Sequence, residues 1–233
     1  MYSSPGAFRV PRTVTAVLGV AVLLASATCT MAQETVHQTL LAGLGPGPSK
    51  GAATAPVLIE EFSDFRCAYC GTFAREVLPR LHAAYIATGK VRFIFRHFAV
   101  LGPASEAAAE AAACAAAQGQ FWPYHDQLYA TQGRLALSRE SLQQLAQELS
   151  LDLAAFTTCL DTEHFRPQVR AETRAALALG LRGTPGFLVN GRQLVGALPF
   201  AVFQSVIDEA LTAAADPQKV PEDNATLAPA SAR

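Results

Sequence analysis

Residues 62–70 read Phe62-Ser63-Asp64-Phe65-Arg66-Cys67-Ala68-Tyr69-Cys70, so two cysteines lie three positions apart. The apolar run Val57-Leu58-Ile59 precedes this segment, and apolar or aromatic residues recur at every fourth position from Phe73 to Tyr85 after it. A short apolar run followed by a helical period predicts a buried strand over residues 57–62, a tight bend and an amphipathic helix. We therefore expect Cys67 at the mouth of this helix and Cys70 in its first turn.

This placement of the two cysteines favours thiol–disulfide exchange. The unpaired amides and the positive dipole end at a helix N-terminus stabilise a thiolate. A cysteine at that position has a pKa below the usual value of about 8.5, which makes it a good nucleophile and a good leaving group. A second cysteine three residues later can close a disulfide with it within one helical turn.

Residues 51–102 are expected to form one strand–helix–strand unit. Pro79 lacks a backbone N–H and should kink the helix near Arg75, and the helix should end near Gly89. Residues 91–98 are rich in β-branched and aromatic residues, which predicts a second strand. Because a helix connects the two strands, we expect them to be parallel.

Residues 103–179 have helical periodicity alone, which predicts a helical block inserted into the α/β frame. Alanine, the best helix former, dominates residues 104–117. Helical patterns continue over residues 121–129, 138–149, 153–160 and 164–179. The frame resumes over residues 180–215, where Asn190-Gly191 between apolar runs predicts a two-residue hairpin and residues 199–211 predict an amphipathic helix.

The two ends of the chain carry signals of a different kind. Residues 1–32 are interpreted as a cleaved signal peptide, with Arg9 and Arg12 before an uncharged apolar run; an uncleaved membrane anchor is the alternative. Cys29 would be lost with that segment. Residues 33–50 are rich in glycine and proline, which predicts a lead-in without a core of its own, and the polar tail over residues 216–233 should be disordered.

Composition and charge narrow the function classes. The chain has 233 residues, of which 51% are hydrophobic and 16% charged, and this suits a compact globular protein. A formal net charge of −1 argues against binding to nucleic acid or to a membrane surface. A structural zinc site at the two cysteines is a minor alternative, because no second C-x-x-C and no H-x₃₋₅-H pair exists. We interpret the five histidines as surface residues or hydrogen-bonded core residues.

Taken in order, these features resemble the DsbA-like family of exported thiol–disulfide oxidoreductases. The resemblance rests on Cys67-Ala68-Tyr69-Cys70 after a strand, on the helical block and on Gly183-Thr184-Pro185 before a hairpin, and it extends over roughly residues 44–213. It implies a thioredoxin fold with an inserted helical domain seated over the active-site end. It further implies a periplasmic or other extracytoplasmic location, no bound cofactor, reduced cysteine-containing exported proteins as substrates and a quinone-linked membrane reoxidant.

The same resemblance implies roles for residues around the cysteines. Cys67 becomes the exposed nucleophile and Cys70 the resolving thiol. Glu61, six residues before Cys67, matches a buried acid that relays protons to the resolving cysteine. The alternation of a strand could turn Glu60 inward instead, and an ordinary solvated carboxylate is a further alternative for Glu61.

Substrate contacts are implied for Thr184, Ala68 and Tyr69. Thr184-Pro185 matches a cis-proline loop that faces the disulfide and pairs with the substrate backbone. Many strong oxidants of the family carry Pro-His between the cysteines, where the histidine favours the thiolate. Ala68-Tyr69 lacks that histidine, so we expect a milder oxidant.

An oxidase is the leading hypothesis for the function. A tyrosine in the second position between the cysteines also resembles exported disulfide isomerases, so an isomerase or a reductase is the second hypothesis. Isomerases need a dimerisation segment, and residues 33–50 are too short and too rich in glycine and proline to supply one, so we expect a monomer. A non-catalytic thioredoxin-like binding module with an inert disulfide is the third hypothesis.

Two further cysteines, Cys114 and Cys159, lie in the helical block and have no C-x-x-C spacing. Without Cys29 the chain has four cysteines, and an even number in an exported chain favours disulfides. We therefore expect a structural disulfide between Cys114 and Cys159. Two separate buried thiols are the alternative, since free cysteine is among the most buried residue types.

Overall fold

The structure, a computed structural model, describes residues 39–215. The chain divides into two compact units, residues 1–43 and 44–233. The described part of the first unit is a helical turn over residues 39–42, closed by a hydrogen bond from Gly43 N to Thr39 O of 3.2 Å. The predicted signal peptide at 1–32 and the predicted disordered tail at 216–233 lie outside the described residues. Within residues 39–215, no helix has the length and apolar character needed to span a bilayer.

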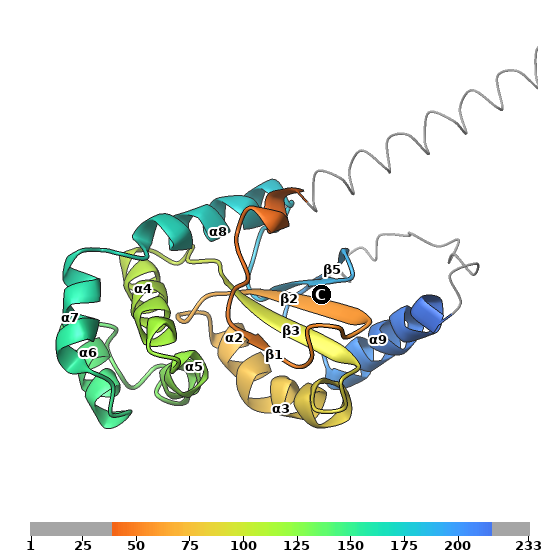
Figure 1. Cartoon of the computed structure of the whole chain (residues 1–233), viewed down its shortest axis with the longest axis horizontal. Coiled ribbons are helices and arrows are strands. Elements are labelled where there is room, and N and C mark those ends of the chain that lie inside the picture. Colours follow the sequence, from red (N-terminus) through yellow and green to blue (C-terminus); the bar gives the residue numbers. More distant parts are fainter. Residues whose placement is uncertain (1–38, 216–233) are drawn as a thin grey trace, which may run out of the picture. The chain divides into compact units, whose positions relative to one another are not determined.

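The second unit is built on a five-stranded mixed sheet with the strand order β1-β3-β2-β4-β5 (Figure 1). The central strands β2 and β3 are parallel, as the strand–helix–strand unit predicted, and the other neighbouring pairs are antiparallel. The strands are β1 (Ser49–Lys50), β2 (Val57–Ser63), β3 (Val91–His97), β4 (Gly186–Val189) and β5 (Arg192–Val195). The strand that leads to the cysteines is therefore the middle strand of the sheet.

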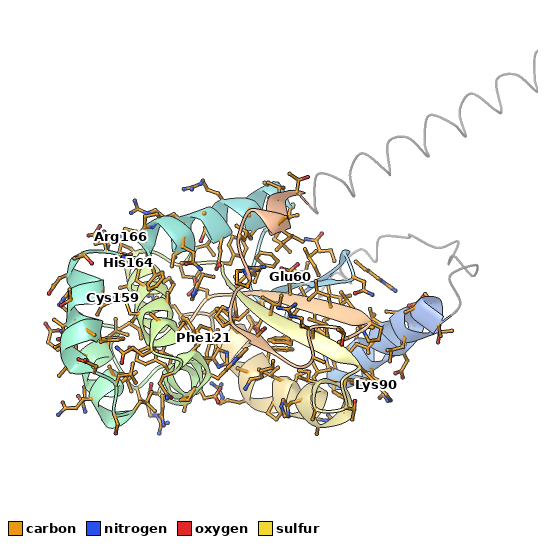
Figure 2. The ribbon with its side chains drawn as sticks, in the orientation of Figure 1. Glu60, Lys90, Phe121, Cys159, His164 and Arg166 are labelled. Atoms are coloured by element: carbon orange, nitrogen blue, oxygen red, sulfur yellow. A yellow bond between two sulfur atoms is a disulfide. The ribbon has the colours of Figure 1, made fainter. Side chains whose placement is uncertain are left out.

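The two faces of the central strands are covered by different helices. Ile59 of β2 and its register partner Phe93 lie on one face, because paired residues of parallel strands point the same way. The helical segment after the cysteines and α9 (Phe200–Ala215) bury this face. Glu60 points to the opposite face, toward α8 (Arg166–Ala178) (Figures 1 and 2).

The helix after the cysteines is interrupted by two π-helical segments. It runs as α2 (Ala68–Thr72), η1 (Phe73–Val77), α3 (Leu78–Leu81) and η2 (His82–Ile86). Pro79 lies in the first turn of α3 and has no N–H to offer the carbonyl of Arg75. The distortion predicted near Arg75 therefore takes the form of a widened helical turn. The helix ends at Ile86, before the predicted end at Gly89.

Helices are the only regular elements that the structure describes between β3 and β4. They are α4 (Pro103–Ala117), α5 (Phe121–Ala130), α6 (Arg139–Glu148), α7 (Leu153–Asp161) and α8. Each helix begins and ends within two residues of the bounds that periodicity predicted. Alanines of α4, aromatic rings of α5 and leucines of α6 form a core here that is distinct from the core under the sheet.

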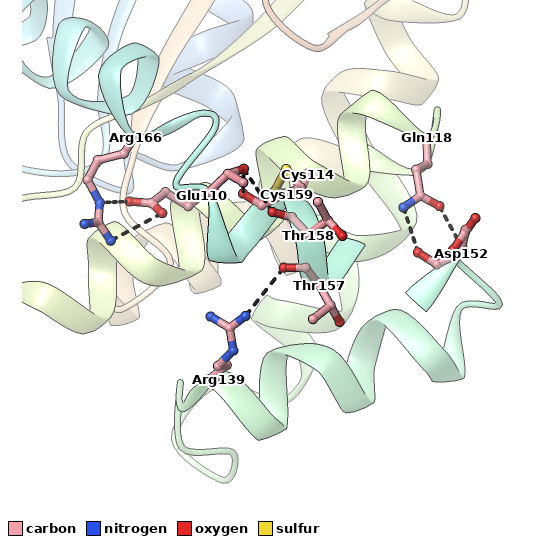
Figure 3. Close-up of a disulfide and its surroundings, with 10 residues drawn as sticks. Glu110, Cys114, Gln118, Arg139, Asp152, Thr157, Thr158, Cys159 and Arg166 are labelled. Atoms are coloured by element: carbon pink, nitrogen blue, oxygen red, sulfur yellow. Dashed lines mark hydrogen bonds and ion pairs between the residues drawn. A yellow bond between two sulfur atoms is a disulfide. The ribbon is translucent and has the colours of Figure 1, made fainter. Parts of the chain in front are cut away.

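α4 carries the contacts that hold α7 and α8 in place. A disulfide joins Cys114 of α4 to Cys159 of α7 (Figure 3). Gln118, at the end of α4, donates from Nε2 to Asp152 O at 3.1 Å and accepts from Asp152 N at 2.8 Å through Oε1. Glu110 forms an ion pair with Arg166 at the start of α8. α4 is thus joined to α7 by a covalent bond and to the start of α8 by an ion pair.

β4 and β5 form the predicted hairpin. Its turn residues Asn190 and Gly191 have φ values of 46° and 86°. Positive φ at both positions is the requirement of a type I′ turn, which asparagine and glycine meet more easily than other residues. The Asn190 side chain also accepts a hydrogen bond from Leu58 N at 2.7 Å, which ties the turn to β2.

Part of the segment 33–50 joins the sheet, which the sequence analysis did not predict. β1 pairs with β3 at the sheet edge. Just before β1, Pro48 O accepts from Phe95 N at 2.9 Å and Gly45 O accepts from Arg96 Nη1 at 2.8 Å. A strand of two residues among glycines and prolines is too short to show the alternation that reveals a strand.

Replacing both Cys114 and Cys159 by serine should lower the free energy of unfolding by roughly 4 kcal/mol. The disulfide closes a loop with a sequence separation of 45, and the chain-entropy account gives that magnitude for such a loop. Urea unfolding of the oxidised proteins, followed by circular dichroism, measures the difference. A variant with Cys67→Ser and Cys70→Ser is the matched control. An unfolding free energy equal to that of the wild type would contradict a stabilising role.

Candidate active site

The candidate site is built at the junction of β2 and α2. β2 ends at Ser63, and the chain then bends so that Cys67 N donates to Asp64 O at 3.0 Å. Cys67 has an extended backbone, with φ −74° and ψ 117°, and it is the N-cap residue of α2. Cys70 lies in the first turn of that helix. This is the strand, bend and helix that the sequence predicted.

The buried carboxylate of Asp64 holds the bend in place. Its Oδ1 accepts hydrogen bonds from Arg66 N at 2.8 Å and from Ser105 Oγ at 2.7 Å. Its Oδ2 accepts from Val100 N at 2.9 Å and from Leu101 N at 3.0 Å. Four donors compensate this carboxylate for the loss of water. The sequence analysis missed Asp64, for which an acidic residue directly after a buried strand is the one local signal.

Cys67 faces the loop that contains Thr184 and Pro185. The peptide bond between those two residues is cis, and Cys67 Sγ lies 3.2 Å from Thr184 O. We expected an exposed nucleophile, but Cys67 is only 7% exposed. The contact with Thr184 joins residues 117 positions apart, so no local pattern signals that the loop covers the sulfur.

The pKa of Cys67 is lowered to about 5. The largest cause is a hydrogen bond from the Cys70 thiol, which stabilises the Cys67 thiolate. The Thr184 side chain and the backbone amides of Cys70 and Tyr69 also lower this pKa, whereas burial opposes them. Cys67 is therefore a thiolate at neutral pH, which is the nucleophilic form of cysteine.

Cys70 behaves in the opposite way. Its side chain is fully buried, and burial raises the pKa of its thiol above the usual range. The hydrogen bond to Cys67 and the negative charge of Glu61 raise the pKa of Cys70 further. The pair thus holds one negative charge and one proton, with the charge on Cys67 and the proton on Cys70.

Glu61 lies fully buried on the face of β2 that α2 covers. Burial is the main cause that raises its pKa to about 8, and the charge of Cys67 adds to this rise. A hydrogen bond of 2.8 Å from Ser63 Oγ to Glu61 Oε1 opposes it. A carboxyl group that titrates near neutral pH can both accept and donate a proton under working conditions. Glu61 is therefore a candidate proton carrier for Cys70.

Glu60, the competing acid, belongs to another network. Its Oε1 accepts from Arg96 Nε at 3.0 Å, and Arg96 also pairs with Glu172 of α8. Successive residues of a strand point to opposite faces, so Glu60 and Glu61 cannot both face α2. The register of the sheet places Glu61 on the side of the cysteines and Glu60 on the side of α8.

Gln132 and Gly71 also shape the site, and the sequence analysis missed both. Gln132 follows α5, and its Nε2 donates to Phe65 O at 3.0 Å and to Cys67 O at 2.8 Å. A Cβ atom on Gly71 would lie 2.1 Å from Gln132 Oε1, so a side chain at residue 71 would displace the glutamine. Because Gln132 is 65 positions from Cys67, the sequence gives no local signal for this contact.

The surface beside Cys67 is rich in exposed apolar groups. Ala68 is exposed, and Tyr69 is 69% exposed. Val100 and Leu101 are also exposed, and a hydrogen bond from the Arg66 guanidinium to Leu101 O holds their loop next to the cysteine segment. Such a surface suits an unfolded polypeptide, whose apolar side chains are accessible.

Two buried histidines, His97 and His125, test the expectation of hydrogen-bonded core histidines. His125 meets it, because its Nδ1 forms a hydrogen bond of 2.8 Å with Asp126 Oδ1. Its Nε2 and His97 Nδ1 have no hydrogen-bond partner among residues 39–215. Burial lowers the pKa of His97 to about 3 and also lowers the pKa of His125, so both rings are neutral. In the part of the chain that the structure describes, no three His, Cys, Asp or Glu residues are grouped to hold a metal ion.

Comparison with known proteins adds independent findings. Residues 45–209 match the family model described as thioredoxin. The oxidised crystal structure of BdbD from Bacillus subtilis is similar, with a TM-score of 0.67, 24% identity and coverage of 71% of this chain and 93% of that one. The probable disulfide bond formation protein D of Bacillus anthracis is 33% identical over 150 residues, which are 61% of this chain and 69% of that protein.

A different kind of relative matches the same length of chain. The Na⁺/H⁺ antiporter NhaA 3 of Salinispora tropica is 33% identical over 167 residues, which are 71% of this chain and 25% of the antiporter. This chain therefore spans about a quarter of the length of that relative. The antiporter's name describes a much longer protein than the segment they share.

In reduced protein at neutral pH, iodoacetamide should alkylate Cys67 much faster than Cys70. Cys67 is then ionised and caps the helix, whereas Cys70 is protonated and fully buried. Quenched time points and peptide mass mapping give both rates. The rate at Cys67 should rise as the pH passes through about 5, the pKa of that thiol. Equal rates, or a faster Cys70, would contradict the assignment of charge.

His97→Leu should reduce the loss of stability in acid. The pKa of His97 is about 3 in the folded protein, below the value of about 6.5 in an unfolded chain. Stability is therefore complete above pH 6.5 or so and falls as the pH drops toward 3, because the unfolded chain takes up the proton first. The variant should retain up to about 3 kcal/mol more of its stability at about pH 4. Urea unfolding across this range is the measurement, and His82→Leu, at an exposed histidine, is the control.

Proposed function

Because this chain belongs to the DsbA-like family of thiol–disulfide oxidoreductases, within the thioredoxin superfamily, we propose that it introduces disulfides into cysteine-containing proteins through Cys67 and Cys70. The observation that carries the proposal is the division of charge between these thiols, with Cys67 ionised and Cys70 protonated at neutral pH. A stable thiolate at Cys67 favours the reduced pair. The disulfide form of the pair is correspondingly a better oxidant.

Oxidation of a substrate takes two exchange steps. A substrate thiolate attacks Cys67 Sγ, so the Cys67–Cys70 bond breaks, a mixed disulfide forms, and Cys70 leaves as a thiolate that takes a proton. A second substrate thiolate then attacks the substrate sulfur of the mixed disulfide. The substrate disulfide forms and Cys67 leaves as a thiolate, stabilised by the amides at the helix N-terminus. Two electrons pass from the substrate to the cysteine pair.

Residues around the thiols have separate roles in this proposal. Glu61 supplies and receives the proton of Cys70, since it is buried on the face of β2 that α2 covers and its pKa is about 8. The loop of Thr184 and Pro185 contacts Cys67 and is placed to pair with the backbone of a bound substrate. The exposed side chains of Ala68 and Tyr69 contact the substrate beside the reacting sulfur.

An extracytoplasmic location follows from this function. Structural disulfides persist in oxidising compartments, and the Cys114–Cys159 bond supports such a setting. The apolar segment within residues 1–32, interpreted as a signal peptide, supports it as well. The substrates would then be reduced exported proteins, and the protein would act as a monomer in the periplasm or an equivalent compartment.

Turnover needs an oxidant that returns Cys67 and Cys70 to the disulfide. We propose a quinone-linked membrane protein as this reoxidant, since a quinone accepts the two electrons that the substrate supplies. If the reduction potential of the pair is as low as that of thioredoxin, the same site would instead reduce or isomerise disulfides. Equilibration of the pair with glutathione buffers measures the potential and decides between these directions.

The Cys70→Ser variant should accumulate mixed disulfides with substrates, and Cys67→Ser should accumulate none. With the resolving thiol removed, a bond between Cys67 and a substrate persists, whereas without Cys67 no bond forms. The variants are first treated with oxidised glutathione, so that an accessible cysteine becomes a glutathione mixed disulfide, and are then incubated with a reduced, unfolded protein that has native disulfides; thiolates of that protein displace glutathione, and the products are separated on non-reducing gels. Wild-type protein should also oxidise this substrate. Trapping by neither variant, together with no oxidation by the wild type, would leave a binding module as the better explanation.

A further inference from the structure

A chain of three buried side chains links β2 to α5 on the cysteine side of the sheet. Ser63 Oγ donates to Glu61 Oε1 at 2.8 Å, and Ser63 Oγ lies 2.9 Å from Tyr129 OH in a second hydrogen bond. Glu61 is 0% exposed, Ser63 2% and Tyr129 1%. The backbone of Tyr129 is itself held, because Arg75 Nη1 donates to Tyr129 O at 2.7 Å. The three polar groups therefore have fixed positions in a region without bulk water.

The number of available protons gives this series of hydrogen bonds a direction. A serine hydroxyl has one proton, and Ser63 donates it to Glu61. Tyr129 must then donate its own proton to Ser63, so both hydroxyl protons point toward the Glu61 carboxylate. When Glu61 is protonated, each bond can reverse, with Glu61 donating to Ser63 and Ser63 donating to Tyr129. The chain can serve either protonation state of Glu61 without leaving a hydroxyl unpaired.

The other oxygen of Glu61 is open to a proton. Glu61 Oε2 is buried and has no hydrogen-bond partner among the described residues. The Ser63 side chain also lies beside the Cys70 thiol, where it opposes the rise in the pKa of Cys70. Ser63 thus contacts both the thiol that loses the proton and the carboxylate that can take it.

Among residues 39–215, the charged and titratable groups packed around Glu61, Ser63 and Tyr129 are few; one is the Arg75 guanidinium, which contacts Tyr129 O. Cys67 and Cys70 face it from α2, and Asp64 faces it from the end of β2. From α5, the ring of His125 packs edge-on against Tyr129 at 4.9 Å, and from β3 His97 packs in the same aromatic cluster. Since both histidines are neutral, neither supplies a positive charge to Glu61. Along this chain, the donor to ionised Glu61 is the Ser63 hydroxyl.

We propose that Ser63 and Tyr129 are positioning residues for the resolving step, because the protons they direct at Glu61 set the pH range in which Glu61 accepts the proton of Cys70. This inference rests on the proposed function. In the step itself, the Cys70 S–H bond breaks and its proton passes to Glu61. The Cys70 thiolate then attacks Cys67 Sγ in a mixed disulfide between Cys67 and a second molecule. The Cys67–Cys70 bond forms, and the sulfur of the second molecule leaves as a thiolate.

The first test measures Glu61 without any catalysis. In oxidised protein the active-site thiols do not titrate, so ¹³C-carboxyl NMR of glutamate-labelled protein follows Glu61, and Glu61→Gln identifies its resonance. Ser63→Ala removes the donor and should raise the midpoint by about one pH unit. Tyr129→Phe should raise it by a smaller amount, since Ser63 still donates but is no longer polarised. Tyr124→Phe, in the same helix as Tyr129, is the control, because the Tyr124 hydroxyl donates to Leu142 O of α6, away from Glu61.

The second test measures the resolving step. Release of glutathione from a Cys67–glutathione mixed disulfide should become faster as the pH rises through the pKa of Glu61. In Ser63→Ala this rise should occur about one pH unit higher, so the rate near neutral pH falls about tenfold and the rate at high pH is unchanged. Tyr129→Phe should shift the rise in the same direction. Glu61→Gln should abolish the rise.

The results separate this inference from the proposed function. Midpoints of Glu61 that are unchanged in both Ser63→Ala and Tyr129→Phe would overturn the inference, even if the wild type oxidises substrates. A wild type that oxidises no substrate would overturn the proposed function, even if the Glu61 midpoint moves as expected. If Ser63→Ala does not fold, Tyr129→Phe decides alone, since it removes a single hydroxyl.

Discussion

Burial of the two thiols and Glu61 leaves room for one negative charge among these three groups. Cys67, Cys70 and Glu61 are each ionisable there, and a second charge in a region closed to water is strongly unfavourable. Helix amides, Thr184 and the Cys70 thiol place that charge on Cys67. Cys70 and Glu61 must then hold protons near neutral pH, as their raised pKa values show. The proposed roles of Cys67 as nucleophile, Cys70 as resolving thiol and Glu61 as proton carrier agree with this constraint.

The helical block supports the site chemically as well as mechanically. α5 and the turn after it bring Tyr129 to Ser63 and Gln132 to the carbonyl of Cys67. The loop before α4 supplies two of the four donors to Asp64, which fixes the bend between strand and helix. The block can hold these groups because its own helices are fastened together through α4. A thioredoxin sheet without this insertion would lack the contacts of Ser105, Tyr129 and Gln132.

Local patterns predicted most of the fold. A buried strand, a helix period and Asn190-Gly191 are signals within a few residues, and the sheet and hairpin agree with them. The contacts of Gln132 and Tyr129 join residues more than 60 positions apart, so nothing nearby in sequence marks them. The sequence also left open which of Glu60 and Glu61 faces the cysteines. Strand residues alternate between the two faces of a sheet, and the alternation alone does not say which set faces α2. The sheet register settles which face each carboxylate occupies.

The dipeptide between the cysteines shows why a local motif is an incomplete guide to reactivity. Ala68-Tyr69 lacks the histidine of many relatives, and for that reason we expected a less favoured thiolate. In the structure, the groups that lower the pKa of Cys67 are the Cys70 thiol, the Thr184 side chain and two backbone amides. None of them is the side chain of residue 68 or 69, and Tyr69 is largely exposed to solvent. The acidity of Cys67 is therefore set first by the Cys70 thiol, then by Thr184 in a loop 117 residues away and by the amides at the helix N-terminus.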